Sequence, residues 1–381
     1  MQPNAPVTRV AMAPNDITRR NPGSIMAAVP DKEGKRGTLL GFPFPKEIFP
    51  MSPERPLVVL AGPIHADGHA NLEREARVVV CTDETEAGLV KMAADAQGIL
   101  FRAKPRCTES LMAACKQLKV VGRHGVGLDT VDIPAATRLG VAVVHAPGSN
   151  SQAVAEHALM LMLVCVKKTL YQDKLTRAGD WGAKKGSATT AHTELAGKTL
   201  GIVGIGNIGR RIARFCGAIG MKVLAYDKYV PADEIRTRGA EPVESLEALM
   251  PQVDVLTCHT PLTPETKHMI NAKTLGLVKR GAVYVNTSRG GVQEEHALFE
   301  ALTRGQLGAA GIDVFEEEPC PVDNPLLNLD NVVLSTHMAG VTKEATARAS
   351  VQVTSEMLRV LRGEKPDVLV NPEVGPRLGL R

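Results

Sequence analysis

The sequence has few aromatic residues, with one tryptophan, four tyrosines and seven phenylalanines among 381 residues. Aliphatic side chains must therefore supply most of any core, and a hydrophobic content of 44% is enough for a globular protein. Long apolar runs are also lacking. The longest, residues 158–166, has nine residues, whereas a membrane-spanning helix needs about 18 or more. We expect no membrane partner.

Paired cysteines and clusters of metal ligands are lacking too. The chain has no Cys-x-x-Cys motif, and most of its cysteines lie within apolar runs. This pattern favours small buried side chains in a reducing compartment over disulfides or metal ligands. We expect a cytoplasmic protein without a metal site. The seven cysteines are Cys81, Cys107, Cys115, Cys165, Cys216, Cys258 and Cys320.

Excess charge is confined to the first part of the chain. Residues 1–56 hold 8 Lys and Arg against 5 Asp and Glu, which leaves 37 against 36 for the remainder. A nearly neutral body gives no concentrated basic face, so we expect no nucleic-acid partner. Residues 1–56 also hold 10 of the 25 prolines, which predicts a disordered or surface-wrapping arm. A transit peptide is the alternative, although no amphipathic helix is evident.

Beyond the arm, short apolar runs alternate with helical patterns in two series. This alternation predicts α/β architecture with parallel sheets, and the length suits two doubly wound domains. The first series of strands is expected at 57–62, 77–80, 98–101, 118–122 and 141–145. The second is expected at 199–203, 222–226, 253–258, 282–286, 309–313 and 331–335.

Two long helices are expected outside this alternation. One should run from Gln152 to about Leu175, and the other from Lys343 to Arg362, with Gly363 as its natural end. The second helix follows the last strand and can return to the first domain. We therefore favour a discontinuous first domain, 57–152 with 343–373, into which residues 153–342 are inserted.

The stretch GIVGIGNIGR places Gly204, Gly206 and Gly209 between a strand and a helix. The first glycine allows a tight turn, the second lets a pyrophosphate approach, and the third permits close packing of helix and strand. The amides of Asn207 and Ile208 open the helix, where anions are favoured. Asp227 ends the next strand, where it suits the ribose of NAD and repels the 2′-phosphate of NADP.

Polar residues follow the ends of the other strands of this series, and such ends line the ligand crevice of an open α/β sheet. The planar fork of Arg289 suits a carboxylate, although a lone arginine is also commonly in a surface salt bridge. His337 suits proton transfer, and one of Glu316, Glu317 and Glu318 can orient its ring. A structural histidine and a solvated acidic loop remain the alternatives.

Together these motifs resemble the D-isomer-specific 2-hydroxyacid dehydrogenase family. The resemblance covers about residues 57–373. It rests on the ordered motifs GIVGIGNIGR, YD, HTPLTPETKHMI, VNTSRGGVQEEHAL, GIDVFEEEP and STHMAG. It extends upstream through VGRHGVGLDTVDI and HAPGSNSQAVAEHALMLML, and downstream to VNPEV. It implies a Rossmann NAD-binding domain inserted into a discontinuous flavodoxin-like substrate domain. The implied activity is NAD-dependent hydride transfer at C2 of a D-2-hydroxy or 2-oxo acid.

The resemblance also implies roles for single residues. Arg289 would bind the substrate carboxylate and carbonyl, His337 would act as acid and base, and Glu318 would orient it. The implied cofactor-binding residues are Gly204, Gly206, Asn207, Ile208, Gly209, Asp227, Thr260, Pro261, Thr266, Ser288, Asp313 and Gly340. The implied substrate-binding residues are Arg102, His124, Gly125, Val126, Gly127 and Arg289.

Several alternatives stay open at this point. Relatives usually carry a small residue at position 124, so His124 either narrows the pocket or is a surface loop histidine. Arg102 either binds a second anionic group or belongs to a solvated basic loop. Phosphoglycerate, glycerate or glyoxylate, and longer acids all remain candidate substrates. A homodimer through the cofactor domain is expected, and an NAD(H)-sensing co-repressor of the same fold is the alternative function.

Overall fold

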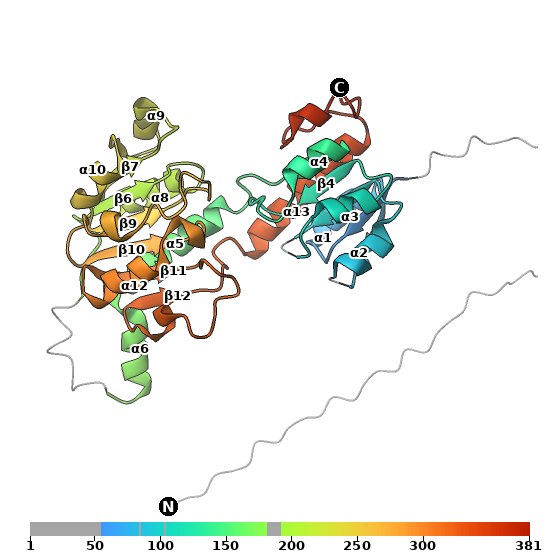
Figure 1. Ribbon diagram of the computed structural model, residues 1–381. Coiled ribbons are helices and arrows are strands. Elements are labelled where there is room, and N and C mark those ends of the chain that lie inside the picture. The colour runs from blue at the N-terminus through green and yellow to red at the C-terminus, as the bar shows by residue number, and fades with distance from the viewer. Residues whose placement is uncertain (1–54, 84, 103, 181–191) are drawn as a thin grey trace, which may run out of the picture. The chain divides into compact units, whose positions relative to one another are not determined.

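The computed structural model describes residues 55–83, 85–102, 104–180 and 192–381 (Figure 1). All of them belong to a unit that runs from Pro53 to Arg381. The expected arm, residues 1–56, lies outside the described residues except for its last two positions.

The first sheet has five parallel strands in the order β2-β1-β3-β4-β5. Its strands are mostly uninterrupted apolar segments, because helices cover both faces of the sheet. The observed ends differ from the expected ones by at most two residues. The strands are β1 (Leu57–Leu60), β2 (Arg77–Val80), β3 (Gly98–Phe101), β4 (Val120–Arg123) and β5 (Ala142–His145).

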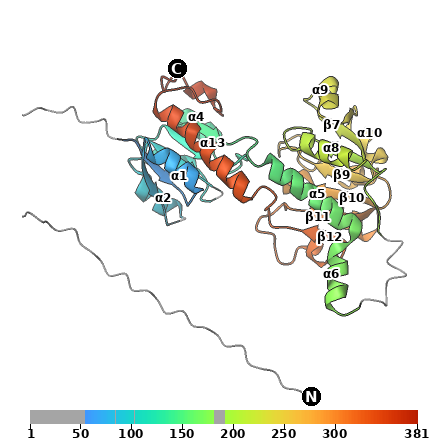
Figure 2. The same cartoon turned by 180° about the vertical axis from the view of Figure 1, so that it is seen from behind.

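Two layers of helices cover this sheet. α2 (Glu86–Ala93), α3 (Glu109–Ala114) and α4 (Ile133–Leu139) share one core with alternate strand residues such as Ile99. α1 (Ala66–Glu73) and α13 (Lys343–Leu361) share the core on the opposite face. Figure 2 shows α13 beside α1, although the two are far apart in the sequence. As expected, α13 ends just before Gly363, whose φ is 78°.

The second sheet has seven parallel strands in the order β12-β11-β10-β9-β6-β7-β8. Six of them match the expected series with small shifts at their ends. β8 was not expected, because two residues are too short to give a periodic pattern. The strands are β6 (Thr199–Val203), β7 (Lys222–Tyr226), β8 (Glu241–Pro242), β9 (Val255–Cys258), β10 (Ala282–Asn286), β11 (Leu307–Ile312) and β12 (Val332–Leu334).

Helices cover both faces of the second sheet as well. α5 (Ser151–Lys167) and α8 (Gly209–Ala218) pack into one core with β6, β7 and β10. α10 (Leu246–Leu249), α11 (Ala272–Leu275) and α12 (Glu295–Thr303) pack on the other face. α9 (Ala232–Thr237) lies beside β8. Because β9 and β7 flank β6 on opposite sides, the strand order reverses at β6, which favours a ligand crevice there.

The single helix expected from Gln152 to about Leu175 is wrong. The helix breaks at Lys168, whose φ is 50°, and α6 (Thr169–Arg177) continues from there. The amide of Lys168 closes α5 by donating to the carbonyls of Val164 and Cys165. α6 has no buried residue, so no apolar face holds it in line with α5. Periodicity alone does not reveal such a break.

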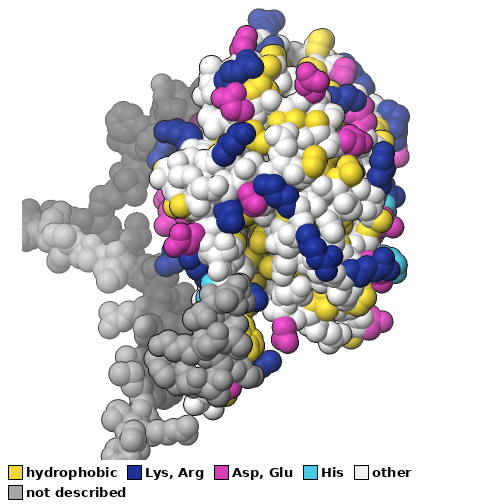
Figure 3. Space-filling view, turned by 90° about the vertical axis from the view of Figure 1, so that its left-hand side faces the viewer, with side chains coloured by type: hydrophobic (Ala, Val, Ile, Leu, Met, Phe, Trp, Pro, Cys, Tyr) yellow, Lys and Arg dark blue, Asp and Glu magenta, His cyan; other side chains and the backbone are white. Residues whose placement is uncertain are grey.

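None of the helices formed by the described residues is long and apolar enough to cross a membrane. On the face shown in Figure 3, Lys and Arg side chains are interspersed with Asp and Glu side chains. This mixture accords with the nearly equal numbers of acidic and basic residues beyond position 56.

Candidate active site

The three glycines form a tight turn between β6 and α8. Gly204 has a φ of 88°, which favours glycine, and a Cβ on Gly209 would lie 2.3 Å from the carbonyl oxygen of Gly204. Nothing lies within 4 Å of a Cβ placed on Gly206. The turn is therefore closed where helix and strand meet and open where an anion would approach the first amides of α8.

Asp227 lies at the end of β7, beside this turn. One oxygen of its carboxylate accepts a hydrogen bond of 2.9 Å from the amide of Ile205. The other accepts hydrogen bonds from the amides of Tyr229 and Val230, at 3.0 and 3.2 Å. These contacts fix the carboxylate against the glycine turn.

The loop after β9 contacts the other side of the turn. A Cβ on Gly204 would lie 2.9 Å from the methyl carbon of Thr260, so the loop packs directly against the glycine. The hydroxyl of Thr266 donates to the carbonyl of Pro261 at 2.6 Å and also accepts from the amide of Thr263 at 2.8 Å. Thr266 thereby holds the loop in shape.

Arg289 follows β10 on a buried polar platform. Asn286 is fully buried, and its amide nitrogen donates to the carbonyl of Arg289 and to the side chain of Gln293, both at 3.0 Å. Its side-chain oxygen accepts from the amide and hydroxyl of Ser288, at 2.9 and 2.7 Å. This network fixes the backbone that carries the guanidinium, and Ser288 is part of it.

The guanidinium of Arg289 forms an ion pair with Asp129, from the segment that follows β4. Its Nη2 and Nε lie 2.9 and 3.1 Å from the same carboxylate oxygen. Burial raises the pKa of Asp129, but the hydrogen bond and charge of Arg289 outweigh it and lower the pKa overall. Asp129 was not among the residues expected from the sequence.

His337 and Glu318 form a second pair at the same edge of the sheet. Nδ1 of His337 lies 2.7 Å from a carboxylate oxygen of Glu318. Burial raises the pKa of Glu318, whereas His337, the amide of Phe315 and, last, the charge of Arg289 lower it, and the net change is downward. Gly290, which follows Arg289, packs against the backbone of Phe315, because a Cβ on Gly290 would lie 1.9 Å from the carbonyl of Phe315. The amide of Phe315 in turn donates to Glu318 at 3.1 Å. These contacts bring the three expected catalytic residues into one charged neighbourhood.

Asp313 supports the loop that carries His337. Its fully buried carboxylate accepts hydrogen bonds from the amides of Met338 and Ala339, both at 2.9 Å, and from Ser335 at 2.6 Å. His337 has a φ of 55°, a conformation that its surroundings must stabilise. The carboxylate of Asp313 also lies 3.7 Å from Nε2 of His157 on α5. Gly340 follows in the same segment as His337 and packs closely against Asn150, since a Cβ on Gly340 would lie 2.5 Å from the side-chain nitrogen of Asn150.

The segment after β4 presents three free amides. Among the described residues, the amides of Gly125, Val126 and Gly127 have no hydrogen-bond partner, whereas the amide of His124 donates to the carbonyl of Phe101 at 2.7 Å. His124 therefore has no free amide to offer a ligand. A Cβ on Gly127 would lie 2.1 Å from Nη2 of Arg289, so the guanidinium lies directly over this segment.

The alternative that placed His124 on a surface loop is wrong. The residue is 8% exposed, and its Nε2 lies 2.7 Å from the hydroxyl of Ser350 on α13. Burial first, and then the charges of Arg102 and Arg123, lower the pKa of His124 to about 4. Its side chain is therefore neutral near neutral pH, and it ties β4 to α13.

Arg102 and Arg289 both place positive charge near Arg123. Arg102 is exposed, and its Nη1 donates to the carbonyl of Pro63 at 3.2 Å. Arg123 was not singled out from the sequence. Its Nη1 donates to the carbonyl of His124, and its Nε is buried without a partner among the described residues. Burial, the charge of Arg289 and, less strongly, that of Arg102 lower the pKa of Arg123, and Asp129 opposes this change.

Comparison with known proteins places these features among known dehydrogenases. Residues 159–339 match a family model described as D-isomer specific 2-hydroxyacid dehydrogenase, NAD binding domain. The chain is 34% identical over 323 residues to a glyoxylate reductase of Korarchaeum cryptofilum, an alignment that covers 84% of this chain and 97% of the relative. Among solved structures, D-mandelate dehydrogenase of Rhodotorula graminis matches with a TM-score of 0.77 and 28% identity, over 83% of this chain and 98% of that one.

A longer relative is also similar. The D-3-phosphoglycerate dehydrogenase of Methanocaldococcus jannaschii is 38% identical over 314 residues, which are 82% of this chain and 59% of the relative. This chain therefore spans about three fifths of the length of that enzyme.

Proposed function

The chain belongs to the D-isomer-specific 2-hydroxyacid dehydrogenase family, and we propose that it transfers a hydride between NAD(H) and C2 of a D-2-hydroxy or 2-oxo acid. The observation that carries this proposal is the neighbourhood of Arg289, Glu318 and His337. These residues follow the carboxyl ends of strands in the second sheet, as the glycine turn does after β6. The co-repressor alternative gains no support from the relatives named above.

The described residues fit the dinucleotide. The open side of Gly206, the first amides of α8 and the carboxylate of Asp227 surround one end of the crevice. These residues would hold the pyrophosphate and ribose, with the loop of Thr260, Pro261 and Thr266 beside them. Ser288, Asp313 and Gly340 complete the proposed set. Bound NAD(H) would accept or supply the hydride, a capacity that no amino-acid side chain has.

Three side chains of this protein would carry the remaining chemistry. In reduction, His337 would donate a proton to the substrate oxygen as negative charge grows on it, and in oxidation it would take the proton back. Glu318 would hold the ring of His337 and favour its charged form. Arg289 would bind the substrate carboxylate and stabilise the same oxygen. The free amides of Gly125, Val126 and Gly127 would contact the carboxylate from the other sheet.

We further propose that the substrate carries a second anionic group, as in 3-phosphohydroxypyruvate. The charges of Arg289 and Arg102 both act on Arg123, and Asp129 is the carboxylate paired with Arg289. A single substrate carboxylate would leave excess positive charge near Arg123, whose Nε has no partner among the described atoms. A phosphate group on the substrate would offset this charge and accept a hydrogen bond from Nε of Arg123. One relative named above is a phosphoglycerate dehydrogenase and another is a glyoxylate reductase, so the relatives include enzymes named for a phosphorylated and for an unphosphorylated acid.

A panel of 2-oxo acids assayed with NADH tests both proposals. We expect 3-phosphohydroxypyruvate to give a higher kcat/KM than glyoxylate, and Arg102→Gln and Arg123→Gln to lower it for the phosphorylated acid alone. If the substitutions lower kcat/KM equally for both acids, the arginines do not select the phosphate. If no acid in the panel oxidises NADH, the proposed activity is wrong.

The remaining proposals concern organisation. We propose that residues 57–152 with 343–373 bind the substrate and that residues 153–342 bind NAD. Supporting this division, α13 shares the core of the first sheet. We also propose a homodimer formed through the second part, which sedimentation velocity would test. The seven cysteines form no disulfide, which supports a reducing, cytoplasmic location.

A further inference from the structure

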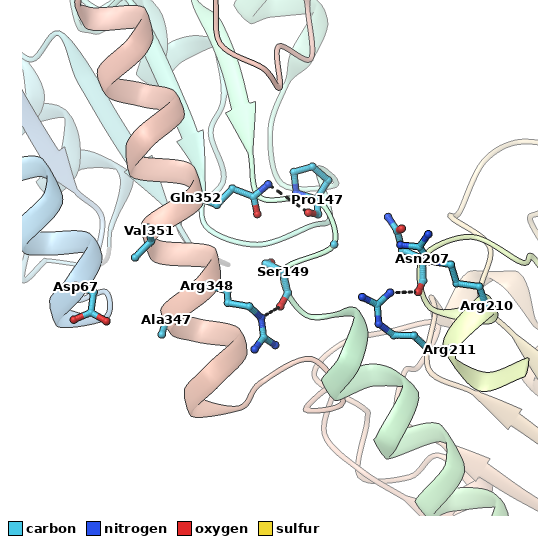
Figure 4. Close-up of a pocket in the computed structure, with 11 residues that line it drawn as sticks. Asp67, Pro147, Ser149, Asn207, Arg210, Arg211, Ala347, Arg348, Val351 and Gln352 are labelled. Atoms are coloured by element: carbon cyan, nitrogen blue, oxygen red, sulfur yellow. Dashed lines mark hydrogen bonds between the residues drawn. The ribbon is translucent and has the colours of Figure 1, made fainter. Parts of the chain in front are cut away.

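A cavity of about 700 Å³ lies beside the glycine turn, on the side of α13. Its walls are the first turn of α8, the face of α13 that points away from the first sheet, and residues 147–149 (Figure 4). Residues 147–149 lie between β5 and α5. Asn207, one of the proposed cofactor-binding residues, lines this cavity, but its other side chains have no role in the proposed reaction.

Three arginines line the cavity: Arg210 and Arg211 on α8, and Arg348 on α13. Nη1 of Arg211 donates to the carbonyl of Asn207 at 2.6 Å, and Nε of Arg348 donates to the carbonyl of Ser149 at 2.9 Å. Each bond uses one N–H group of a guanidinium and fixes its direction. The other N–H groups remain available, so two of the three arginines are already held in place for a ligand.

The positive charges in this cavity are poorly compensated. Within the described part of the chain, none of the three guanidinium groups forms an ion pair with a carboxylate. Burial and then the charges of Arg210, Arg214 and Arg348 lower the pKa of Arg211, so the guanidinium groups repel one another. Bringing like charges together costs free energy unless an anion offsets it.

Two carboxylates lie nearby, and neither neutralises the group. Asp67 lines the cavity from α1, but Figure 4 shows it well apart from the three arginines. Glu344 lies one turn before Arg348 on α13. Its pKa is lowered chiefly by hydrogen bonds from its own amide and from Thr342, and only then by Arg348. The cavity therefore retains an excess of positive charge.

We propose that this arginine cavity binds the phosphate groups of a small anionic ligand. Arginine N–H groups match phosphate oxygens, and the polar side chains of Asn207, Ser149 and Gln352 supply further contacts. Two sources have this chemistry. One is the pyrophosphate of the dinucleotide, in which case the inference rests on the proposed function and adds Arg211 and Arg348 to its cofactor site. The other is a separate phosphorylated metabolite.

Calorimetric titration of the nucleotide-free protein with inorganic pyrophosphate, at low salt, tests the proposal. We expect binding to the wild type and roughly tenfold weaker binding for Arg211→Gln and for Arg348→Gln, since each removes a charge-assisted contact. The control is Arg280→Gln, because Arg280 also donates to a backbone carbonyl, that of Arg304, but does not line the cavity. The control should bind as the wild type does.

A second titration with NADH, followed by its fluorescence, separates the two sources. If the arginine variants also weaken NADH binding and NADH displaces pyrophosphate, the ligand is the dinucleotide. If NADH binding is unchanged, a separate phosphorylated ligand is supported. Absence of pyrophosphate binding in the wild type, or equal binding in wild type and arginine variants, would overturn the proposal. Because neither titration needs His337, both results are independent of whether the dehydrogenase activity exists.

Discussion

Asp129 lies where it must compete with a substrate carboxylate for Arg289. Both use the same guanidinium, and Asp129 already holds two of its N–H groups. We expect the substrate carboxylate to take these same two N–H groups, so that substrate binding breaks the ion pair. The substitution Asp129→Asn keeps the size of the side chain and removes its charge, so we expect it to lower KM for the 2-oxo acid.

The exposure of the pair sets the size of this effect. The side chains of Arg289 and Asp129 are 31% and 55% exposed, and exposed pairs contribute about 0.2–1 kcal/mol. The corresponding decrease in KM is about 1.4- to 5-fold. Because salt screens exposed charges, the difference between variant and wild type should shrink as ionic strength rises.

Steady-state kinetics with NADH and a 2-oxo acid measure this effect, at two salt concentrations. The matched control is Asp233→Asn, which breaks the exposed ion pair with Arg236 on α9, away from the candidate site. It should leave KM unchanged. If Asp129→Asn raises KM, Asp129 positions Arg289 for the substrate and does not compete with it, and the reasoning is refuted. An unchanged KM at low salt refutes it as well.

Three further outcomes are expected. His337→Ala should lower turnover about a hundredfold or more, since general acid catalysis contributes that much, and steady-state kinetics check it. The pKa of Glu318 is below its usual 4.5, so Glu318 stabilises the fold above pH 4.5 and loses this effect as pH falls through the lowered pKa. Denaturant unfolding should therefore show wild type more stable than Glu318→Gln at neutral pH, with the gap closing in acid. Gly209→Ala should destabilise by about 1–3 kcal/mol through its contact with Gly204, whereas Gly217→Ala, with open space around it, should not.

The sequence was sufficient to predict the two parallel sheets, because strands buried on both faces appear as uninterrupted apolar runs. It did not reveal the end of α5 at Lys168. Nothing in the local pattern distinguishes Lys168 from a helical residue, and α6 beyond it has no buried residue.

The candidate site was predictable where one motif carries its own chemistry. The glycine turn is of this kind. The choice of Glu318 among Glu316, Glu317 and Glu318 rested on the family resemblance, and Nδ1 of His337 does lie 2.7 Å from a carboxylate oxygen of Glu318. Asp129 and Arg123 were missed because their significance depends on contacts with Arg289, 160 residues away for Asp129. Buried Asn286 was likewise read as the end of a strand, since a platform for Arg289 is visible only once the chain is folded.

The most direct test of the central claim is to follow the hydride itself. NADH carrying deuterium at both hydrogen positions of C4 of its nicotinamide would be incubated with the protein and the best 2-oxo acid of the panel. The product would be analysed by mass spectrometry and chiral chromatography. We expect a D-2-hydroxy acid with deuterium at C2, formed by wild type and formed about a hundredfold or more slowly by His337→Ala. A product without deuterium, or of L configuration, would contradict the account.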